Sequence, residues 1–119
     1  MFKKYGESVG EEPFMWLAVT KPFKNINLIF PTKQKDVRKM IEVCKKDKNI
    51  QKIIIFGSST TSLCTPWSDI DIYFEFKKAP NSYPSTGSNN AVFDKWDNFT
   101  VDDRLLDEIK KTGVVVFER

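Results

Sequence analysis

Apolar residues change their spacing several times along the chain, and each spacing predicts a different element. The continuous apolar run Ile-Ile-Ile-Phe at 53–56 is typical of a buried strand, which we place at 51–56. From Asp69 to Phe76 polar and apolar residues alternate strictly. This alternation predicts a strand with its odd-numbered residues on one face and its even-numbered residues on the other.

A helical spacing appears on either side of these strands. Four apolar residues at i, i+3, i+4 and i+7 predict a helix over roughly 33–47 capped by Thr32: Val37, Met40, Ile41 and Cys44. The sequence Thr-Val-Asp-Asp at 100–103 has the form of a capping box and predicts a second helix that ends at Gly113. Its inward residues would be Val101, Leu105, Leu106 and Ile109.

The remaining segments give shorter signals. Residues 91–99 and 114–117 are predicted strands, 59–63 is a predicted short helix, and 77–90 has the composition of a mobile loop. The runs 14–19 and 26–30 fit either strands or packed coil. Together the elements predict one α+β domain over 1–119, a small mixed sheet flanked by helices, with 1–30 as an N-terminal extension of unknown role.

Charge is distributed unevenly along the chain. Residues 21–52 carry ten Lys or Arg against three acids, whereas 69–119 carry seven against ten. The basic half could attract phosphates, nucleic acid or an acidic partner. The commoner structure is a helix whose solvated side holds the basic residues, here Lys33, Lys35, Arg38, Lys39, Lys45, Lys46 and Lys48. We therefore expect these basic residues to form a solvated helix face rather than a surface that binds nucleic acid.

Composition excludes several chemistries. The chain has no histidine, which rules out Ser-His and Cys-His dyads and His-ligated zinc. Its two cysteines, Cys44 and Cys64, lack a metal-binding spacing and fit reduced thiols. Neither a signal peptide nor a membrane span is visible, so we expect a cytoplasmic protein that does not contact a membrane.

The most informative motif joins the two central strands. Gly57 and Ser58 end the first strand, where glycine permits a positive φ and close approach of an anion, and the serine hydroxyl can donate to a phosphate. Asp69 and Asp71 project from one face of the next strand, about 6–7 Å apart along it. Such a pair can bind Mg²⁺, and two ions could serve the transfer of a nucleotide.

The run from Ile53 through Gly57-Ser58 to Asp69-Ile70-Asp71 resembles the signature of the minimal nucleotidyltransferases (MNT) of the DNA polymerase β superfamily: a hydrophobic strand ending in Gly-Ser, ten residues, then Asp-x-Asp. The resemblance covers about 35–119, because the final strand–helix–strand also looks like the family's. It implies a polymerase β palm-like fold. Ser59 and Ser62 depart from the family pattern, which often has Arg and Gly at these places.

The resemblance implies a third catalytic carboxylate on the strand after the loop, and Asp94 and Asp97 compete for that role. Strand alternation puts the two on opposite faces, so at most one can join Asp69 and Asp71. The family's spacing to the glycine at the end of the last helix, here Gly113, favours Asp94.

The resemblance also implies a function. The chain is expected to transfer AMP, or another nucleoside monophosphate, from ATP or another nucleoside triphosphate to a hydroxyl group, with Asp69, Asp71 and Asp94 as catalytic and metal-binding residues. Gly57, Ser58 and Ser59 would hold the nucleotide. Stand-alone relatives resemble antitoxins that modify a HEPN-type toxin, which makes such a protein the expected acceptor. The alternative is a non-catalytic antitoxin that retains the motif and acts by binding.

Overall fold

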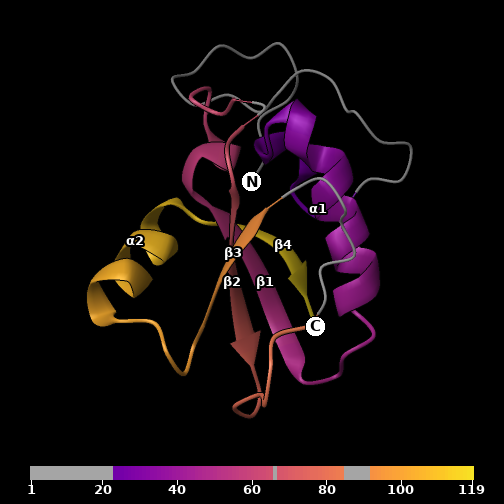
Figure 1. The fold of residues 1–119 in the computed structure, drawn as a ribbon, viewed down its shortest axis with the longest axis vertical. Coiled ribbons are helices and arrows are strands. Elements are labelled where there is room, and N and C mark those ends of the chain that lie inside the picture. The colour runs from indigo at the N-terminus through magenta and orange to yellow at the C-terminus, as the bar shows by residue number, and fades with distance from the viewer. Residues whose placement is uncertain (1–22, 66, 85–91) are drawn as a thin grey trace.

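The sheet has four strands in the order β3-β2-β1-β4 and a helix on each face (Figure 1). The computed structural model describes residues 23–65, 67–84 and 92–119. Strand β1 pairs antiparallel with both β2 and β4, whereas β2 and β3 run parallel. The strands are β1 (Ile50–Phe56), β2 (Ile70–Phe76), β3 (Phe93–Asp97) and β4 (Val114–Glu118), and the helices are α1 (Pro31–Cys44) and α2 (Asp103–Thr112). This arrangement confirms the predicted mixed sheet and the α+β class.

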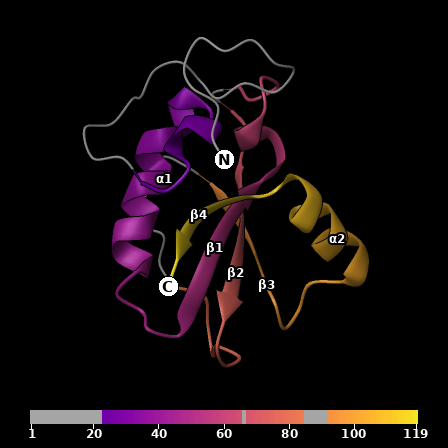
Figure 2. The same ribbon diagram turned by 180° about the vertical axis from the view of Figure 1, so that it is seen from behind.

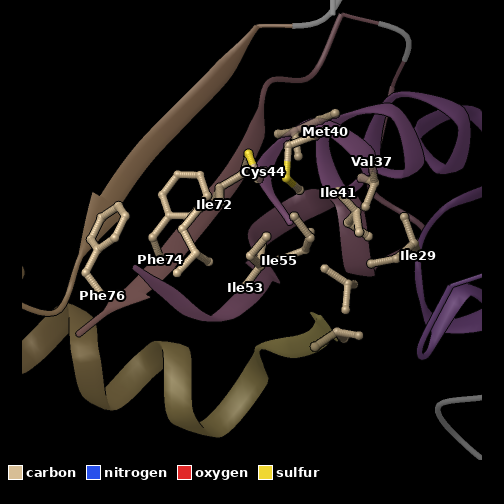
Figure 3. Close-up of a cluster of buried hydrophobic side chains, with 14 residues drawn as sticks. Ile29, Val37, Met40, Ile41, Cys44, Ile53, Ile55, Ile72, Phe74 and Phe76 are labelled. Carbon is tan, nitrogen blue, oxygen red and sulfur yellow. The ribbon is translucent and has the colours of Figure 1, made fainter. Parts of the chain in front are cut away.

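The larger core lies between α1 and the sheet. The four apolar residues predicted on the inward side of α1 are all buried. They pack against the even-numbered residues of β2 and against Ile53 and Ile55 of β1 (Figure 3). Phe74 is fully buried and stacks with Phe76, with ring centroids 5.5 Å apart. The strand alternation read from the sequence therefore identifies this face correctly.

Helix α2 lies on the opposite side of the sheet from α1 (Figure 2), and a smaller core lies on that face. Its buried residues are Phe56, Tyr73 and Ile109. The Phe56 and Trp96 rings pack at 5.5 Å in a tilted arrangement. Other apolar residues on this side are only partly buried: Ile54, Val101, Leu105 and Leu106. The odd-numbered residues of β2 are thus less completely buried than the even-numbered ones.

Both helices begin at different residues from those predicted. Helix α1 begins at Pro31 and has no side-chain cap, because proline's fixed φ and missing N–H suit the first helical position. Helix α2 begins at Asp103, where the Asp102 carboxylate accepts the Leu105 N–H at 2.8 Å. Asp102 is therefore the cap in place of Thr100.

Gly113 ends α2 as predicted, but for a different reason from the usual left-handed cap. Its φ is −72°, so a positive φ does not explain the glycine. A Cβ at this position would overlap the Ile109 carbonyl oxygen and the Ile54 side chain. Lack of space therefore requires glycine between the helix and β1.

The short connections also differ from the predictions. Residues 26–28 form a 3-10 turn, η1 (Ile26–Leu28), and the predicted helix at 59–63 is a single 3-10 turn, η2 (Gly57–Thr60). The described part of the predicted mobile loop is anchored, because Tyr83 stacks on Phe76 with centroids 6.3 Å apart. The prediction for 14–19 and the rest of that loop lie outside the described residues. Within the described residues, no helix has the length and apolar character needed to cross a membrane.

Candidate functional site

Gly57 forms the turn directly after β1 and lies against a carboxylate. Its φ is +76°, a conformation that glycine adopts without steric cost. A Cβ at Gly57 would overlap the Asp71 Oδ2 atom. The contact follows from the register, in which Phe56 pairs with Asp71 across β1 and β2. Glycine is therefore needed both for the turn and for the space that Asp71 occupies.

The parallel pairing of β2 and β3 brings a second carboxylate to Asp71. Asp94 is the direct partner of Asp71 in the register, and Trp96 is the partner of Tyr73. Neighbouring strands lie about 4.8 Å apart, and paired residues share a face. Asp71 and Asp94 therefore project side by side on the α2 side of the sheet. Asp69 precedes the first residue of β2 and is exposed.

Asp97 has different surroundings from Asp94. It pairs with Phe74, on the α1 side of the sheet, and is 2% exposed. Its Oδ1 accepts the Phe99 N–H at 2.7 Å and the Thr100 N–H at 3.0 Å. These bonds stabilise the turn that follows β3. The structure thus separates the two candidates: Asp94 lies beside Asp71, and Asp97 is a buried turn residue.

The carboxylates affect the protonation of Asp71. Partial burial raises its pKa to about 6, and the negative charges of Asp94, Asp69 and Glu108 add to the rise. Like charges held this close favour a proton or a bound cation between them. Within the described residues, however, no three Asp, Glu or Cys side chains are close enough to form a complete metal site by themselves. Any cation here would need further oxygen ligands from a substrate or water.

The two serines of the turn differ in accessibility. Ser58 is half-buried, and its carbonyl accepts the Thr61 N–H at 3.0 Å. Ser59 is fully buried, and its Oγ has no hydrogen-bond partner among the described residues. Its carbonyl accepts the Phe30 N–H at 2.7 Å at the start of α1. Of these two predicted nucleotide-binding residues, Ser59 therefore has a buried hydroxyl in this conformation, whereas the Ser58 side chain is partly accessible.

Two charged residues near the site were not predicted to belong to it. Glu108 of α2 contributes to the raised pKa of Asp71. Lys33 was predicted on the solvated side of the first helix, but it is 5% exposed and its Nζ donates to the Ser68 carbonyl at 2.6 Å. The other basic residues of that helix and of 45–48 are exposed or half-exposed, as predicted. Lys33 lies four residues before Val37, so the helical period could have placed it on the buried side.

Comparison with known proteins identifies the fold. The model of the nucleotidyltransferase domain family matches residues 37–118. A chain in the solved structure of the tri-AMPylated HEPN toxin from Shewanella oneidensis in complex with MNT antitoxin is 18% identical, with a TM-score of 0.53 over 73% of each chain. No curated protein sequence matches. These similarities confirm the predicted family resemblance and the nucleotidyltransferase fold.

Proposed function

Because the chain belongs to the family of nucleotidyltransferase domains, we propose that it transfers AMP from ATP, or another nucleoside monophosphate, to a hydroxyl of a HEPN-type partner protein. The observation that supports this most is the direct pairing of Asp71 with Asp94, beside the Gly57 turn. The partner class is suggested by the similar fold in the complex of MNT antitoxin with an AMPylated HEPN toxin.

The donor set suits Mg²⁺. Carboxylates are the ligands that this hard cation prefers, and it usually takes one or two of them together with phosphate oxygens and water. Asp69, Asp71 and Asp94 would hold the metal, and we expect two ions. When bound, Mg²⁺ neutralises phosphate charge and lowers the barrier to displacement at phosphorus. The like-charge contribution to the raised pKa of Asp71 favours such a cation.

The residues of the chain would orient the substrates. Gly57 leaves backbone space at the end of β1 for the triphosphate, and the half-buried Ser58 hydroxyl can donate to a phosphate oxygen. The acceptor oxygen attacks the α-phosphorus, the bond from that phosphorus to the bridging oxygen breaks, and pyrophosphate leaves. Asp94 would accept the proton of the acceptor hydroxyl.

Labelled ATP tests this proposal directly. The chain is incubated with Mg²⁺, the protein encoded by the neighbouring gene, and ATP labelled in either the α- or the γ-phosphate. Nucleotidyl transfer moves only the α-label to the acceptor, whereas a kinase would move the γ-label. Asp69→Asn and Asp71→Asn should abolish transfer. Asp107→Asn, which changes an exposed carboxylate paired with Lys111 at 3.0 Å, is the matched control and should retain it.

The same experiment separates catalysis from binding alone. If the chain is a non-catalytic antitoxin, the wild-type protein, Asp69→Asn and Asp71→Asn would all neutralise the partner equally well. No label would then appear on the partner. That result would overturn the proposed transfer. Label on the partner that disappears in both variants and persists in Asp107→Asn would establish it.

A further inference from the structure

Lys33 is a buried cation at the edge of the proposed site. It lies in the first turn of α1 and is 5% exposed. Within the described part of the chain it forms no ion pair, and its ammonium makes one hydrogen bond, to the Ser68 carbonyl at 2.6 Å. Burying an ammonium without a counter-charge is costly. Stability alone is therefore a weak reason for a lysine at this position.

The bond made by Lys33 fixes the backbone beside Asp69. Asp69 is exposed and lies outside the ladder of β2, so its position depends on the peptide groups on either side. On its C-terminal side the Ile70 N–H donates to the Val92 carbonyl at 2.8 Å. On its N-terminal side the Ser68 carbonyl accepts from Lys33. Lys33 thus provides the long-range anchor for the N-terminal side of Asp69.

Among the described residues, the other hydrogen bonds of Ser68 are local. The Thr65 N–H donates to Ser68 Oγ at 2.9 Å, and the Ser68 N–H donates to the Thr65 carbonyl at 3.0 Å. These bonds shape the turn but do not attach it to the sheet. Within the described part of the chain, the long-range hydrogen bond of Ser68 is the one from Lys33.

The same end of α1 also contacts the Gly-Ser turn. The Phe30 N–H donates to the Ser59 carbonyl at 2.7 Å, and the Lys33 N–H donates to the Phe30 carbonyl at 2.8 Å. One helix terminus therefore contacts both η2, where the nucleotide is proposed to bind, and the peptide that precedes Asp69. The two halves of the proposed site are joined here by hydrogen bonds.

We propose that Lys33 is a positioning residue, which holds Asp69 in place relative to Asp71 and the Gly57 turn through the Ser68 carbonyl. The inference rests on the proposed function. A residue that only supports a metal ligand typically changes metal affinity 10–100-fold when it is replaced. Lys33 should therefore influence binding of the metal and the nucleotide more than the stability of the fold.

Lys33→Met tests the inference, because it keeps the aliphatic stem and removes the ammonium. Two probes measure the site: Mn²⁺ alone, and Mn²⁺ with an ATP analogue that has a methylene group between its α- and β-phosphates. We expect both affinities to fall at least about tenfold and the KM for MgATP to rise more than kcat falls. The midpoint of unfolding should stay the same or rise, because a buried unpaired charge is gone.

Two neighbouring substitutions serve as controls. Lys35→Met changes an exposed lysine of the same turn and should alter nothing. Gln34→Met changes a fully buried residue whose Nε2 donates to the Ile29 carbonyl at 3.0 Å, and should lower the midpoint of unfolding without changing Mn²⁺ affinity. Hydrogen exchange at the Asp69 and Ile70 amides should accelerate only in Lys33→Met. If that variant does not fold, Lys33→Leu, which also lacks an N–H donor, is measured against the same limits.

The outcomes distinguish this inference from the proposed function. Wild-type protein that neither binds Mn²⁺ nor transfers label refutes the proposed function. Active wild type with unchanged affinities and unchanged exchange in Lys33→Met refutes the positioning role. So does a loss of affinity that merely follows a lowered midpoint and appears equally in Gln34→Met.

Discussion

The two faces of the sheet differ in what they contain. The α1 face is covered by a continuous cluster of buried apolar residues, including Phe74 and Met40. On the α2 face the buried core residues in the described part of the chain are Phe56, Tyr73 and Ile109, and Asp71 and Asp94 project beside them. One face therefore supplies most of the burial that stabilises the fold. The other holds like charges that oppose folding and offer a binding site.

The difference shows how one strand can serve both purposes. Ile72 points into the α1 core, and its neighbour Asp71 lies on the other face next to Gly57. Because side chains alternate along a strand, the packing of one face fixes the position of the carboxylate on the other. Substitutions on both faces test this separation, from the largest expected effect to the smallest.

Truncation of a large side chain should reveal the unequal cores. Phe74→Ala removes a fully buried ring from the α1 face and should lower the free energy of unfolding by about 3–5 kcal/mol. Leu105→Ala changes a half-buried residue of the α2 face and should lower the free energy of unfolding by about 1–2 kcal/mol. Urea denaturation of both variants measures the difference. Equal losses would show that the faces contribute alike.

The two aspartates of β3 should separate function from stability. Asp94→Ala should reduce nucleotidyl transfer by more than about 100-fold, because even residues that only support metal ligands cost 10–100-fold. Asp97→Ala should retain transfer. Its free energy of unfolding should fall by about 1–3 kcal/mol, because two backbone N–H groups of the turn lose their acceptor. Transfer assays and urea denaturation test both. The reverse pattern would assign the third carboxylate to Asp97.

Substitution of Gly57 should reduce both the stability of the fold and the binding of metal. Gly57→Ala places a methyl group at a φ of +76° and against Asp71, so it should cost about 1–2 kcal/mol from the backbone alone. It should also displace the Asp71 carboxylate and weaken Mn²⁺ binding. Ser58→Ala is the comparison, since it should raise the KM for ATP while leaving the midpoint of unfolding unchanged. A Gly57→Ala protein with normal stability and Mn²⁺ affinity would contradict the close contact.

The smallest predicted effect is the pH dependence contributed by Asp71. Its pKa in the folded chain is about 6, above the ordinary value of 3.8, so ionisation opposes folding. The penalty is absent at a pH below about 4, grows as the pH rises, and is complete above about 6. Asp71→Asn should thus unfold at a higher temperature than metal-free wild type at neutral pH. Solvent screening should keep the gain below about 1 kcal/mol.

Calorimetry at acid and neutral pH measures this effect. The difference in unfolding temperature between wild type and Asp71→Asn should vanish at a pH below about 4. Addition of Mg²⁺ should raise the unfolding temperature of wild type more than that of the variant. A difference that is independent of pH would show that the charge of Asp71 is not its cause.

The sequence predicted the elements whose periodicity is simple. The alternation in β2 and the spacing of Val37, Met40, Ile41 and Cys44 identified the α1 core, since each pattern reports which side of an element is buried. The helix starts were predicted less well. Thr100 and Asp102 are both plausible caps, and only the packed chain selects Asp102.

The site was predictable to the extent that strand alternation decides it. Alternation showed that Asp94 and Asp97 lie on opposite faces, but the choice between them depends on the register of β3 against β2, which a single strand does not specify. The roles of Lys33 and Ser59 depend on contacts between α1 and segments far along the chain. No local pattern contains such contacts.

The position of β3 at the edge of the sheet has a consequence for how the protein loses its site. In the described sheet β3 is paired with β2 alone, whereas β2 and β1 each have two neighbours. Edge strands open locally at a lower free energy than the central strands of a sheet. A transient opening of β3 would carry Asp94 away from Asp71 while the α1 core remained folded. Amide exchange in 93–97 should then exceed that in β1, and warming should accelerate it before the α1 core melts.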